Sequence, residues 1–331
     1  MKNILVTGGC GFIASNFINH FLKKYQKYVL VNLDAMYYCA REDNILEEIR
    51  NSNNYNFIKG SVCNKEIIDL IFKTWNIDTI IHFAAQSHVD NSFSNPLQYT
   101  EDNIKGTHTL LECIRDYGKI EKFIHVSTDE VYGESGADIK NEKSILNPTN
   151  PYAATKAAAE MLVNSYVYSY NLPAIITRGN NVYGPRQYPE KLIPKFALSL
   201  INDKLCTVHG EGKTERSFLY VSDVVDAFEL ILFKGEIGEI YNIGTENEYS
   251  VIDITRRLVK IIKNEDEYQN YIEYVEDRKY NDKRYNIAFE KLRQLGWEQK
   301  IDIDEGLKLT IDFYKNIKFI NNWNLKNFYI Y

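Results

Sequence analysis

The sequence has none of the features of a membrane or secreted protein. Its 331 residues contain no apolar run of about 18 residues, the length that a membrane-spanning helix needs. The first residues, MKNILVTGG, carry no apolar signal-peptide core ahead of the first expected strand. Internal repeats, Gly/Ser linkers and low-complexity segments are missing as well. We therefore expect a globular protein that has no membrane partner and is not exported.

Concentrated positive charge is also missing. The chain has 39 Lys+Arg against 45 Asp+Glu, a formal net charge of −6, and no run of five or more basic residues. Such a chain has no long-range attraction for a phosphodiester backbone or an anionic lipid surface. The charge pattern argues against nucleic acid as a partner.

The cysteines form no pattern that indicates disulfides or a metal site. There are five, an odd number, with no C-x-x-C pair and no histidine at metal-ligand spacing: Cys10, Cys39, Cys63, Cys113 and Cys206. We expect reduced thiols, a cytoplasmic location and no bound metal.

What the sequence does contain is a regular alternation of strands and helices. The length suggests two domains at roughly 150 residues each. Alternating strands and helices indicate right-handed βαβ units, and therefore an α/β fold with a Rossmann-like, doubly wound parallel sheet. The expected strands cover residues 3–7, 28–34, 55–59, 79–85, 122–127 and 174–177, and the expected helices cover residues 12–25, 67–75, 103–117 and 154–170.

The alternation weakens after about residue 179. Short strands such as residues 205–209 and helices such as residues 251–263 predict a smaller, mixed α/β substrate-binding lobe. We expect a dinucleotide-binding domain over residues 1–178 and this lobe over residues 179–331. Residues 220–245 are expected to return to the first domain, through a helix over residues 222–233 and a strand over residues 240–243.

A glycine-rich turn between the first strand and the first helix indicates a dinucleotide site. The run TGGCGFIA places small residues at Gly8, Gly11 and Ala14, which lets the backbone approach a pyrophosphate at the helix N-terminus. Asp34 ends the second strand, where a carboxylate accepts hydrogen bonds from an adenosine ribose. A carboxylate there repels a 2′-phosphate, so the pattern favours NAD over NADP.

A second group of residues points to proton transfer at an alcohol. Tyr152 and Lys156 lie four residues apart on one face of a helix opened by Pro151. The lysine ammonium is expected to lower the pKa of the phenol, which makes Tyr152 a general base for a hydroxyl. Thr128 follows a strand whose C-terminal end should face the ligand.

With these motifs, the sequence resembles the extended short-chain dehydrogenase/reductase family. Within it, the resemblance is to nucleotide-sugar 4,6-dehydratases, in particular the UDP-glucose 4,6-dehydratase portion of eukaryotic UDP-rhamnose synthases. It covers roughly residues 1–315 and rests on AAQSHVDNSF (84–93), STDEVYGE (127–134), NPYAATKAAAEMLV (150–163), RGNNVYGP (178–185) and PEKLIPKF (189–196).

The resemblance implies a set of catalytic roles. Tyr152 would take the proton of the C4 hydroxyl while NAD accepts hydride, and Thr128 would bond that oxygen. Glu130 would then remove the C5 proton, and Asp129 would protonate the departing C6 hydroxyl. The product would be a 4-keto-6-deoxy-glucose nucleotide, the first step toward rhamnose-type deoxysugars. Two adjacent carboxylates can divide these tasks only if their environments separate their pKa values.

The resemblance also implies the binding residues. For the cofactor they are Gly8, Gly11, Phe12, Ile13, Asp34, Ser61, Val62, Ala84, Tyr152 and Lys156; for the nucleotide-diphosphate glucose they are Ser87, Asn181, Glu190, Lys191, Arg216, Arg278 and Asn281. Asn281 favours UDP-glucose, with dTDP-glucose as a possible second substrate.

Two other functions stay open at this point. One is a nucleotide-sugar C4 epimerase or decarboxylase that uses the same Tyr/Lys oxidation, and the other is a non-catalytic protein that binds NAD or a nucleotide sugar. For the 4,6-dehydratase, the resemblance implies a homodimer in which the helices of residues 103–117 and 154–170 form a four-helix bundle.

Overall fold

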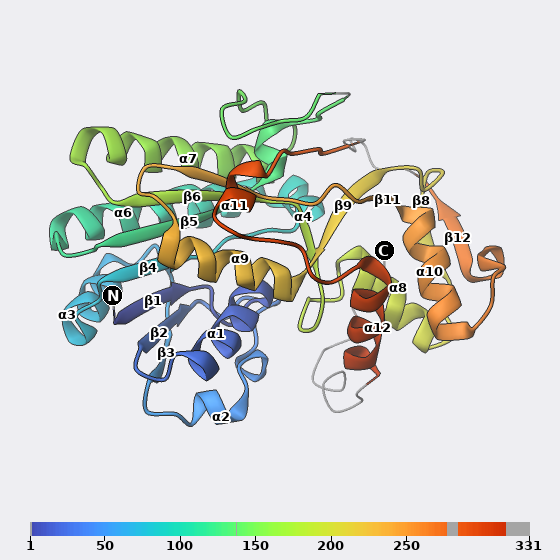
Figure 1. The fold of residues 1–331 in the computed structure, drawn as a ribbon, viewed down its shortest axis with the longest axis horizontal. Helices are drawn as coiled ribbons and strands as arrows, with labels where there is room; N and C mark the ends of the chain where they lie inside the picture. Colours follow the sequence, from blue (N-terminus) through green and yellow to red (C-terminus); the bar gives the residue numbers. More distant parts are fainter. Residues whose placement is uncertain (1, 137, 277–283, 316–331) are drawn as a thin grey trace.

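A seven-stranded parallel sheet forms one half of the protein, on the left in Figure 1. The computed structural model describes residues 2–136, 138–276 and 284–315. The strand order is β10-β6-β5-β4-β1-β2-β3, and every neighbouring pair is parallel. The strands are β1 (Asn3–Thr7), β2 (Val29–Asp34), β3 (Tyr55–Lys59), β4 (Thr79–His82), β5 (Lys122–Thr128), β6 (Ala174–Gly179) and β10 (Ile240–Ile243). This order confirms the predicted doubly wound sheet.

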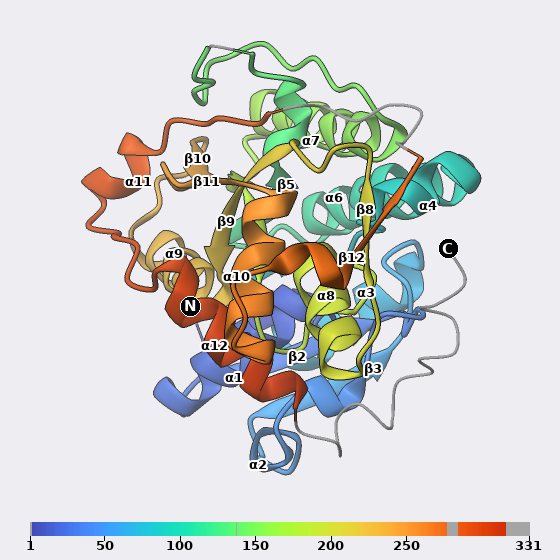
Figure 2. The ribbon, with the colours of Figure 1, turned by 90° about the vertical axis from the view of Figure 1, so that its right-hand side faces the viewer.

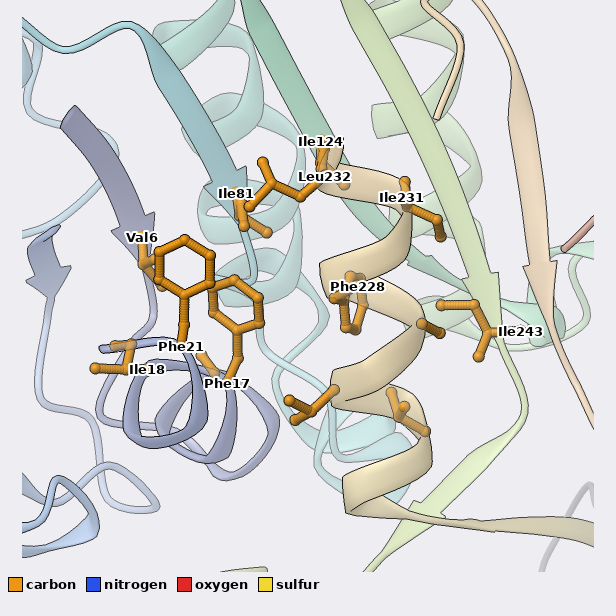
Figure 3. Packing of buried hydrophobic residues seen from close by; sticks show 14 of the residues in the cluster. Val6, Phe17, Ile18, Phe21, Ile81, Ile124, Phe228, Ile231, Leu232 and Ile243 are labelled. Atoms are coloured by element: carbon orange, nitrogen blue, oxygen red, sulfur yellow. The ribbon is translucent and has the colours of Figure 1, made fainter. Parts of the chain in front are cut away.

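Two long helices cover one face of the sheet. They are α1 (Phe12–Lys24) and α9 (Val221–Lys234), which meet through the rings of Phe17, Phe21 and Phe228 above the strands (Figure 3). Phe17 and Phe21 stack with ring centroids 5.3 Å apart. Because helices cover both faces, strands such as β1 have an apolar centre and are buried from Ile4 to Thr7 instead of alternating between buried and exposed residues. The short helix α11 (Glu290–Gln294) packs at the edge of the same core.

Three helices cover the opposite face: α3 (Lys65–Trp75), α6 (Gly106–Tyr117) and α7 (Pro151–Tyr170). The start of α7 is well determined, because the Asn150 side chain accepts a hydrogen bond from the Ala153 amide and Pro151 occupies the first turn. Asn171, in the left-handed conformation, ends the helix. Shorter elements connect the layers: η1 (Glu42–Asn44), α2 (Glu47–Arg50), α4 (Val89–Ser94), α5 (Pro96–Tyr99), the π-helical η2 (Thr100–Lys105) and η3 (Asp129–Tyr132).

The second half of the protein is a smaller lobe with its own apolar core, which faces the viewer in Figure 2. Its helices are α8 (Leu192–Ile201), α10 (Val251–Lys263), α12 (Ile303–Tyr314) and the short η4 (Tyr268–Tyr271). Its strands form a three-stranded sheet of β7 (Asn181–Tyr183), β9 (Glu215–Tyr220) and β11 (Glu248–Ser250), and a pair of β8 (Cys206–His209) and β12 (Ile272–Val275).

Several elements differ from the sequence-based expectation. The helix expected over residues 103–117 begins with the π-helical turn η2 and becomes α-helical only at Gly106. The strand expected over residues 79–85 ends at His82. Beyond it the Phe83 amide donates to the Thr7 carbonyl at 3.2 Å and the Ala84 amide donates to the Thr7 hydroxyl at 3.3 Å, and Thr7 is the last residue of β1, so the ladder with β1 does not continue.

The chain returns to the large sheet after entering the lobe, because β10 pairs in parallel with β6. The division into domains after residue 178 stays a prediction. Among the described residues, none of the helices combines the length and the apolar character required to traverse a lipid bilayer.

Candidate functional site

Two cavities meet at the C-terminal ends of the parallel strands. The glycine-loop cavity, of about 250 Å³, lies over Gly8, Gly11 and Asp34. The lobe cavity, of about 380 Å³, reaches from Thr128 to Arg216 in the small lobe. Tyr152 lines both cavities, so it stands at their junction. Open parallel sheets place ligands at this edge.

The glycine-loop cavity contains the whole set of residues that the sequence predicts for the cofactor. Its walls include Gly8, Gly11, Phe12, Ile13, Asp34, Ser61, Val62, Ala84, Tyr152 and Lys156. The structure adds Tyr37, Cys39 and Tyr188, which sequence reasoning missed because no short motif marks them.

The backbone of this cavity fits a dinucleotide. Gly8 has φ of +70°, and a Cβ atom there would lie 2.7 Å from the Ala84 Cα, so only glycine suits the position. Gly11 precedes α1 without any side-chain cap on the helix. The first-turn amides of Phe12 and Ile13 are therefore available to an anion such as a pyrophosphate.

Asp34 is held firmly at the end of β2. Its Oδ2 accepts a hydrogen bond from the Cys10 amide at 2.9 Å, and its Oδ1 accepts one from the Met36 amide at 2.7 Å. Burial raises the pKa of this carboxyl, and the two backbone hydrogen bonds oppose the rise. Each carboxylate oxygen keeps a further lone pair, which can accept a hydrogen bond from a ribose hydroxyl.

Tyr152 and Lys156 lie on α7 as the sequence predicts, but the electrostatics of the pair differ from the expectation. Burial raises the pKa of the Tyr152 phenol, the Glu130 charge raises it further, and a hydrogen bond with Thr128 opposes both. The Lys156 ammonium donates to the Val126 carbonyl at 2.7 Å. Burial also lowers the pKa of Lys156 to about 8. Without bound ligands, the Lys156 ammonium therefore does not offset the rise in the pKa of Tyr152 that burial causes.

The adjacent carboxylates Asp129 and Glu130 occupy different environments. Asp129 is 2% exposed, and its Oδ1 accepts a hydrogen bond from the hydroxyl of Thr128, which lines the lobe cavity. Burial raises the pKa of Asp129 to about 7, and the neighbouring Glu130 adds to the rise. Glu130 lines the lobe cavity and accepts a hydrogen bond from the Asn150 amide group at 3.0 Å. The turn η3 thus buries one carboxyl beside Thr128 at the edge of the cavity and leaves the other facing into the cavity.

Two asparagines that the sequence analysis did not single out hold these carboxyl groups. Asn180 Nδ2 donates to Asp129 Oδ2 at 2.7 Å, and Asn180 Oδ1 accepts from the Thr245 amide at 3.1 Å, which fixes the orientation of the side chain. Asn150, the cap of α7, donates to Glu130. Both asparagines lie in strings that the sequence analysis quotes, RGNNVYGP and NPYAATKAAAEMLV, but their contacts cross between elements.

Five of the residues predicted for the substrate line the lobe cavity: Ser87, Asn181, Glu190, Lys191 and Arg216. Lys191 donates to the Ser87 carbonyl at 3.0 Å. The Arg216 guanidinium lies over the Tyr285 ring, 4.9 Å from its centroid. Lys191 and Arg216 give the cavity two cationic groups for an anionic ligand. The other two predicted residues, Arg278 and Asn281, fall outside the described residues.

Glu190 has a more constrained position than the sequence suggests. It lines both cavities, and its Oε2 accepts a hydrogen bond from the Tyr38 hydroxyl at 2.7 Å. The Tyr38 ring in turn packs edge-on against Tyr188, with centroids 5.3 Å apart. A loop after β2 thereby contacts the small lobe across the glycine-loop cavity. Over the part of the chain that the structure describes, no group of three His, Cys, Asp or Glu side chains could hold a metal ion.

Comparison with known proteins gives consistent matches along the chain. A family model described as GDP-mannose 4,6 dehydratase matches residues 5–310. The trifunctional UDP-glucose 4,6-dehydratase/UDP-4-keto-6-deoxy-D-glucose 3,5-epimerase/UDP-4-keto-L-rhamnose-reductase of Arabidopsis thaliana is 50% identical over 316 residues, which are 95% of this chain and 47% of that protein. The chain thus spans about half the length of this plant relative.

Shorter relatives match over most of their own length. The dTDP-D-glucose 4,6-dehydratase of Mus musculus is 48% identical over 325 residues, 97% of this chain and 90% of that protein. The crystal structure of the dTDP-glucose 4,6-dehydratase of Streptomyces venezuelae, with NAD bound, superposes with a TM-score of 0.91 at 34% identity, covering 96% of this chain and 98% of that one.

Proposed function

Because this chain belongs to the GDP-mannose 4,6 dehydratase family, we propose that it is an NAD-dependent nucleotide-diphosphate-glucose 4,6-dehydratase, with UDP-glucose as the favoured substrate. One observation carries this proposal. A buried carboxyl, Asp129, and a cavity-facing carboxylate, Glu130, stand beside Tyr152 and Lys156 at the junction of two cavities. Water elimination needs an acid and a base that differ in environment.

The first step is oxidation at C4 of the sugar. NAD bound in the glycine-loop cavity supplies a hydride acceptor and later returns the hydride. Tyr152, at the junction, takes the proton of the C4 hydroxyl, and Thr128 holds the same oxygen. The positive charge of the oxidised nicotinamide would also lower the pKa of the Tyr152 phenol, which burial alone raises. The base therefore becomes effective only in the loaded site.

The second step is loss of water from C5 and C6. The C4 ketone acidifies the C5 proton, which Glu130 removes from the cavity side. Asp129 protonates the departing C6 hydroxyl through Oδ1, because Oδ2 is engaged by Asn180. A carboxyl with a pKa of about 7 is largely protonated at slightly acidic pH and is therefore able to act as an acid. Hydride return to C6 and protonation at C5 then complete the 4-keto-6-deoxy sugar.

The preference for UDP-glucose over dTDP-glucose is the finer part of the proposal. The motifs of the sequence, including Asn281, support UDP-glucose. The two nucleotides differ by one methyl group on the base and by the ribose 2′-hydroxyl. Comparison of kcat/KM for the two substrates tests this preference. We expect a ratio of about 10 to 200 in favour of UDP-glucose, the range that a single methyl contact supports, and a ratio below one would overturn it.

The reaction itself is tested by the fate of UDP-glucose in D₂O. We expect a 4-keto-6-deoxy sugar that carries deuterium at C5, detected by NMR and mass spectrometry, because Glu130 exchanges its proton with solvent before it returns one. Formation of UDP-galactose would instead identify a C4 epimerase. Unchanged substrate, with binding still measurable by calorimetry, would identify a non-catalytic binding protein.

Gly8→Ala is expected to abolish measurable NAD binding. The added Cβ would lie 2.7 Å from the Ala84 Cα in a backbone conformation with positive φ, so the turn must move away from the pyrophosphate position. Gly238→Ala is the matched control, since Gly238 also has positive φ but no atom lies within 4 Å of its added Cβ. Both variants should lose about 1–2 kcal/mol of stability, and calorimetry should show loss of NAD binding only for Gly8→Ala.

We also propose a cytoplasmic homodimer. All five cysteines are free thiols, which fits a reducing compartment. On α7, a stripe that includes Ala154, Met161, Ser165 and Tyr168 is exposed, with Met161 61% and Tyr168 85% accessible. A helix face of this kind can pack against its copy, as expected for the four-helix bundle of α6 and α7.

Met161→Glu is expected to convert the dimer to a monomer. A glutamate on the stripe would bring like charges together in the bundle, and it should weaken association by at least about a hundredfold. Analytical ultracentrifugation over a dilution series measures the change. Leu309→Glu, on α12 and 42% exposed, is the control. An equal effect of both substitutions, or none of either, would contradict the proposed interface.

A further inference from the structure

The hydroxyl of Thr128 lies between the acid and the base of the proposed reaction. Thr128 Oγ1 donates to Asp129 Oδ1 at 3.2 Å, and Thr128 lines the lobe cavity together with Tyr152, whose pKa the neighbouring Thr128 hydroxyl lowers. A lone pair of Thr128 Oγ1 accepts from the Glu130 amide at 3.3 Å. The oxygen thus has one proton to donate, one lone pair engaged by the backbone and one remaining lone pair that can accept a proton.

At the end of each turnover, the proposed chemistry leaves Tyr152 and Asp129 in protonation states opposite to those in which they began. Tyr152 begins as the phenolate and ends protonated, because it takes the C4 hydroxyl proton. Asp129 begins protonated and ends as the carboxylate, because its proton leaves in the water. Glu130 takes the C5 proton and one returns to C5, so its balance is zero. One proton must therefore pass from Tyr152 to Asp129 before the next cycle.

Resting on the proposed function, we propose that Thr128 is the relay that returns this proton from Tyr152 to Asp129 within the protein. The Tyr152 O–H bond breaks and its proton binds Thr128 Oγ1, while the Thr128 hydroxyl proton binds Asp129 Oδ1. Thr128 then donates to the phenolate and accepts from the carboxylic acid. No electrons are transferred, and no other reactant is needed.

The surroundings favour this route over exchange with water. Asp129 is 2% exposed, and Thr128 and Tyr152 are each 8% exposed. Among the described residues, the other side chain that hydrogen-bonds Asp129 is Asn180, whose Nδ2 donates to Oδ2 and cannot deliver a proton to that carboxylate without becoming an anion. Because Asn180 engages Oδ2 of Asp129, the oxygen that is reprotonated is Oδ1, which lies next to Thr128.

The experiment compares the first turnover with the later ones. Enzyme loaded with NAD at slightly acidic pH is mixed with excess UDP-glucose, and the 4-keto product is followed by rapid quench. Thr128→Val has the shape of threonine but no hydroxyl, so it should release about one product per active site in a burst, followed by a steady state at least about tenfold slower. Thr128→Ser keeps the hydroxyl and should show no burst.

The outcomes separate three explanations. If Thr128 only holds the C4 oxygen, the first turnover and the steady state of Thr128→Val slow by the same factor, and the relay is wrong. A burst in Thr128→Ser as well would also overturn it. If wild-type protein forms no 4-keto product, the proposed function itself fails. Thr128→Ala, which cannot clash, carries the same test if the valine variant does not fold.

Discussion

Asp129→Asn is expected to lower the rate of water loss about 10²–10⁴-fold, the contribution of a positioned general acid, while oxidation at C4 continues. Asparagine keeps the size of the side chain and its contact with Asn180, but it has no acidic proton for the leaving hydroxyl. The near-ultraviolet absorbance of the bound cofactor reports oxidation, and product NMR reports water loss. Combination with Glu130→Gln should remove the remaining elimination, and undiminished dehydration would contradict both assignments.

The pH dependence provides a second check on Asp129. Its pKa of about 7 means that the acid form is lost above neutral pH, so the rate of water loss in wild-type protein should fall as pH rises through about 7. Stability should change in the same direction. A carboxyl whose pKa is raised on folding from 3.8 contributes its stabilisation fully below pH 3.8 and loses it as pH rises through about 7.

Asparagine carries no charge at any pH, so the variant avoids this loss. At pH 8 we expect Asp129→Asn to be more stable than wild type by at most about 4 kcal/mol, with little difference at pH 4. Thermal unfolding at the two pH values measures this. A variant that is both inactive and unstable at pH 8 would contradict the burial of an uncompensated charge at this position.

Glu160→Gln is expected to destabilise the protein by about 3–5 kcal/mol, the cost of leaving one member of a buried ion pair without its partner. Arg178 on β6 donates to Glu160 on α7 from Nε at 3.0 Å and from Nη2 at 2.6 Å, and their side chains are 3% and 0% exposed. Arg178 Nη1 also donates to the Tyr132 hydroxyl at 2.7 Å. Urea unfolding of the NAD-loaded and NAD-free protein measures the loss.

The position of this pair explains why activity should fall as well. Tyr132 ends the turn η3 that carries Asp129 and Glu130, so the pair joins the helix of Tyr152 to that turn. Glu48→Gln is the matched control, because Glu48 pairs with Lys23 at 2.8 Å on the surface, with both side chains more than half exposed. We expect no measurable change there, since solvent screens such pairs. Equal effects of the two substitutions would contradict the structural role.

Much of this protein was predictable from its sequence, because the relevant signals are local. The alternation of strands and helices predicts the parallel sheet, since each βαβ unit has one favoured hand. The glycine run before α1 and Asp34 at the end of β2 predict a dinucleotide cavity, and the structure places all ten predicted residues on its wall. The four-residue spacing of Tyr152 and Lys156 places both on one face of α7.

Only the tertiary structure decided how these groups work together. Asp129 and Glu130 are neighbours in sequence, yet their environments differ. Asn180 holds the buried Asp129 carboxyl, and Asn150 holds the Glu130 carboxylate that faces the cavity; both asparagines come from other elements. Whether a carboxyl is desolvated depends on everything packed around it, which no local pattern encodes. The same holds for the Tyr38–Glu190 contact and for the place of Thr128 between base and acid. The sequence by itself determined which chemical groups are present, and the packing of distant segments determined their protonation and their partners.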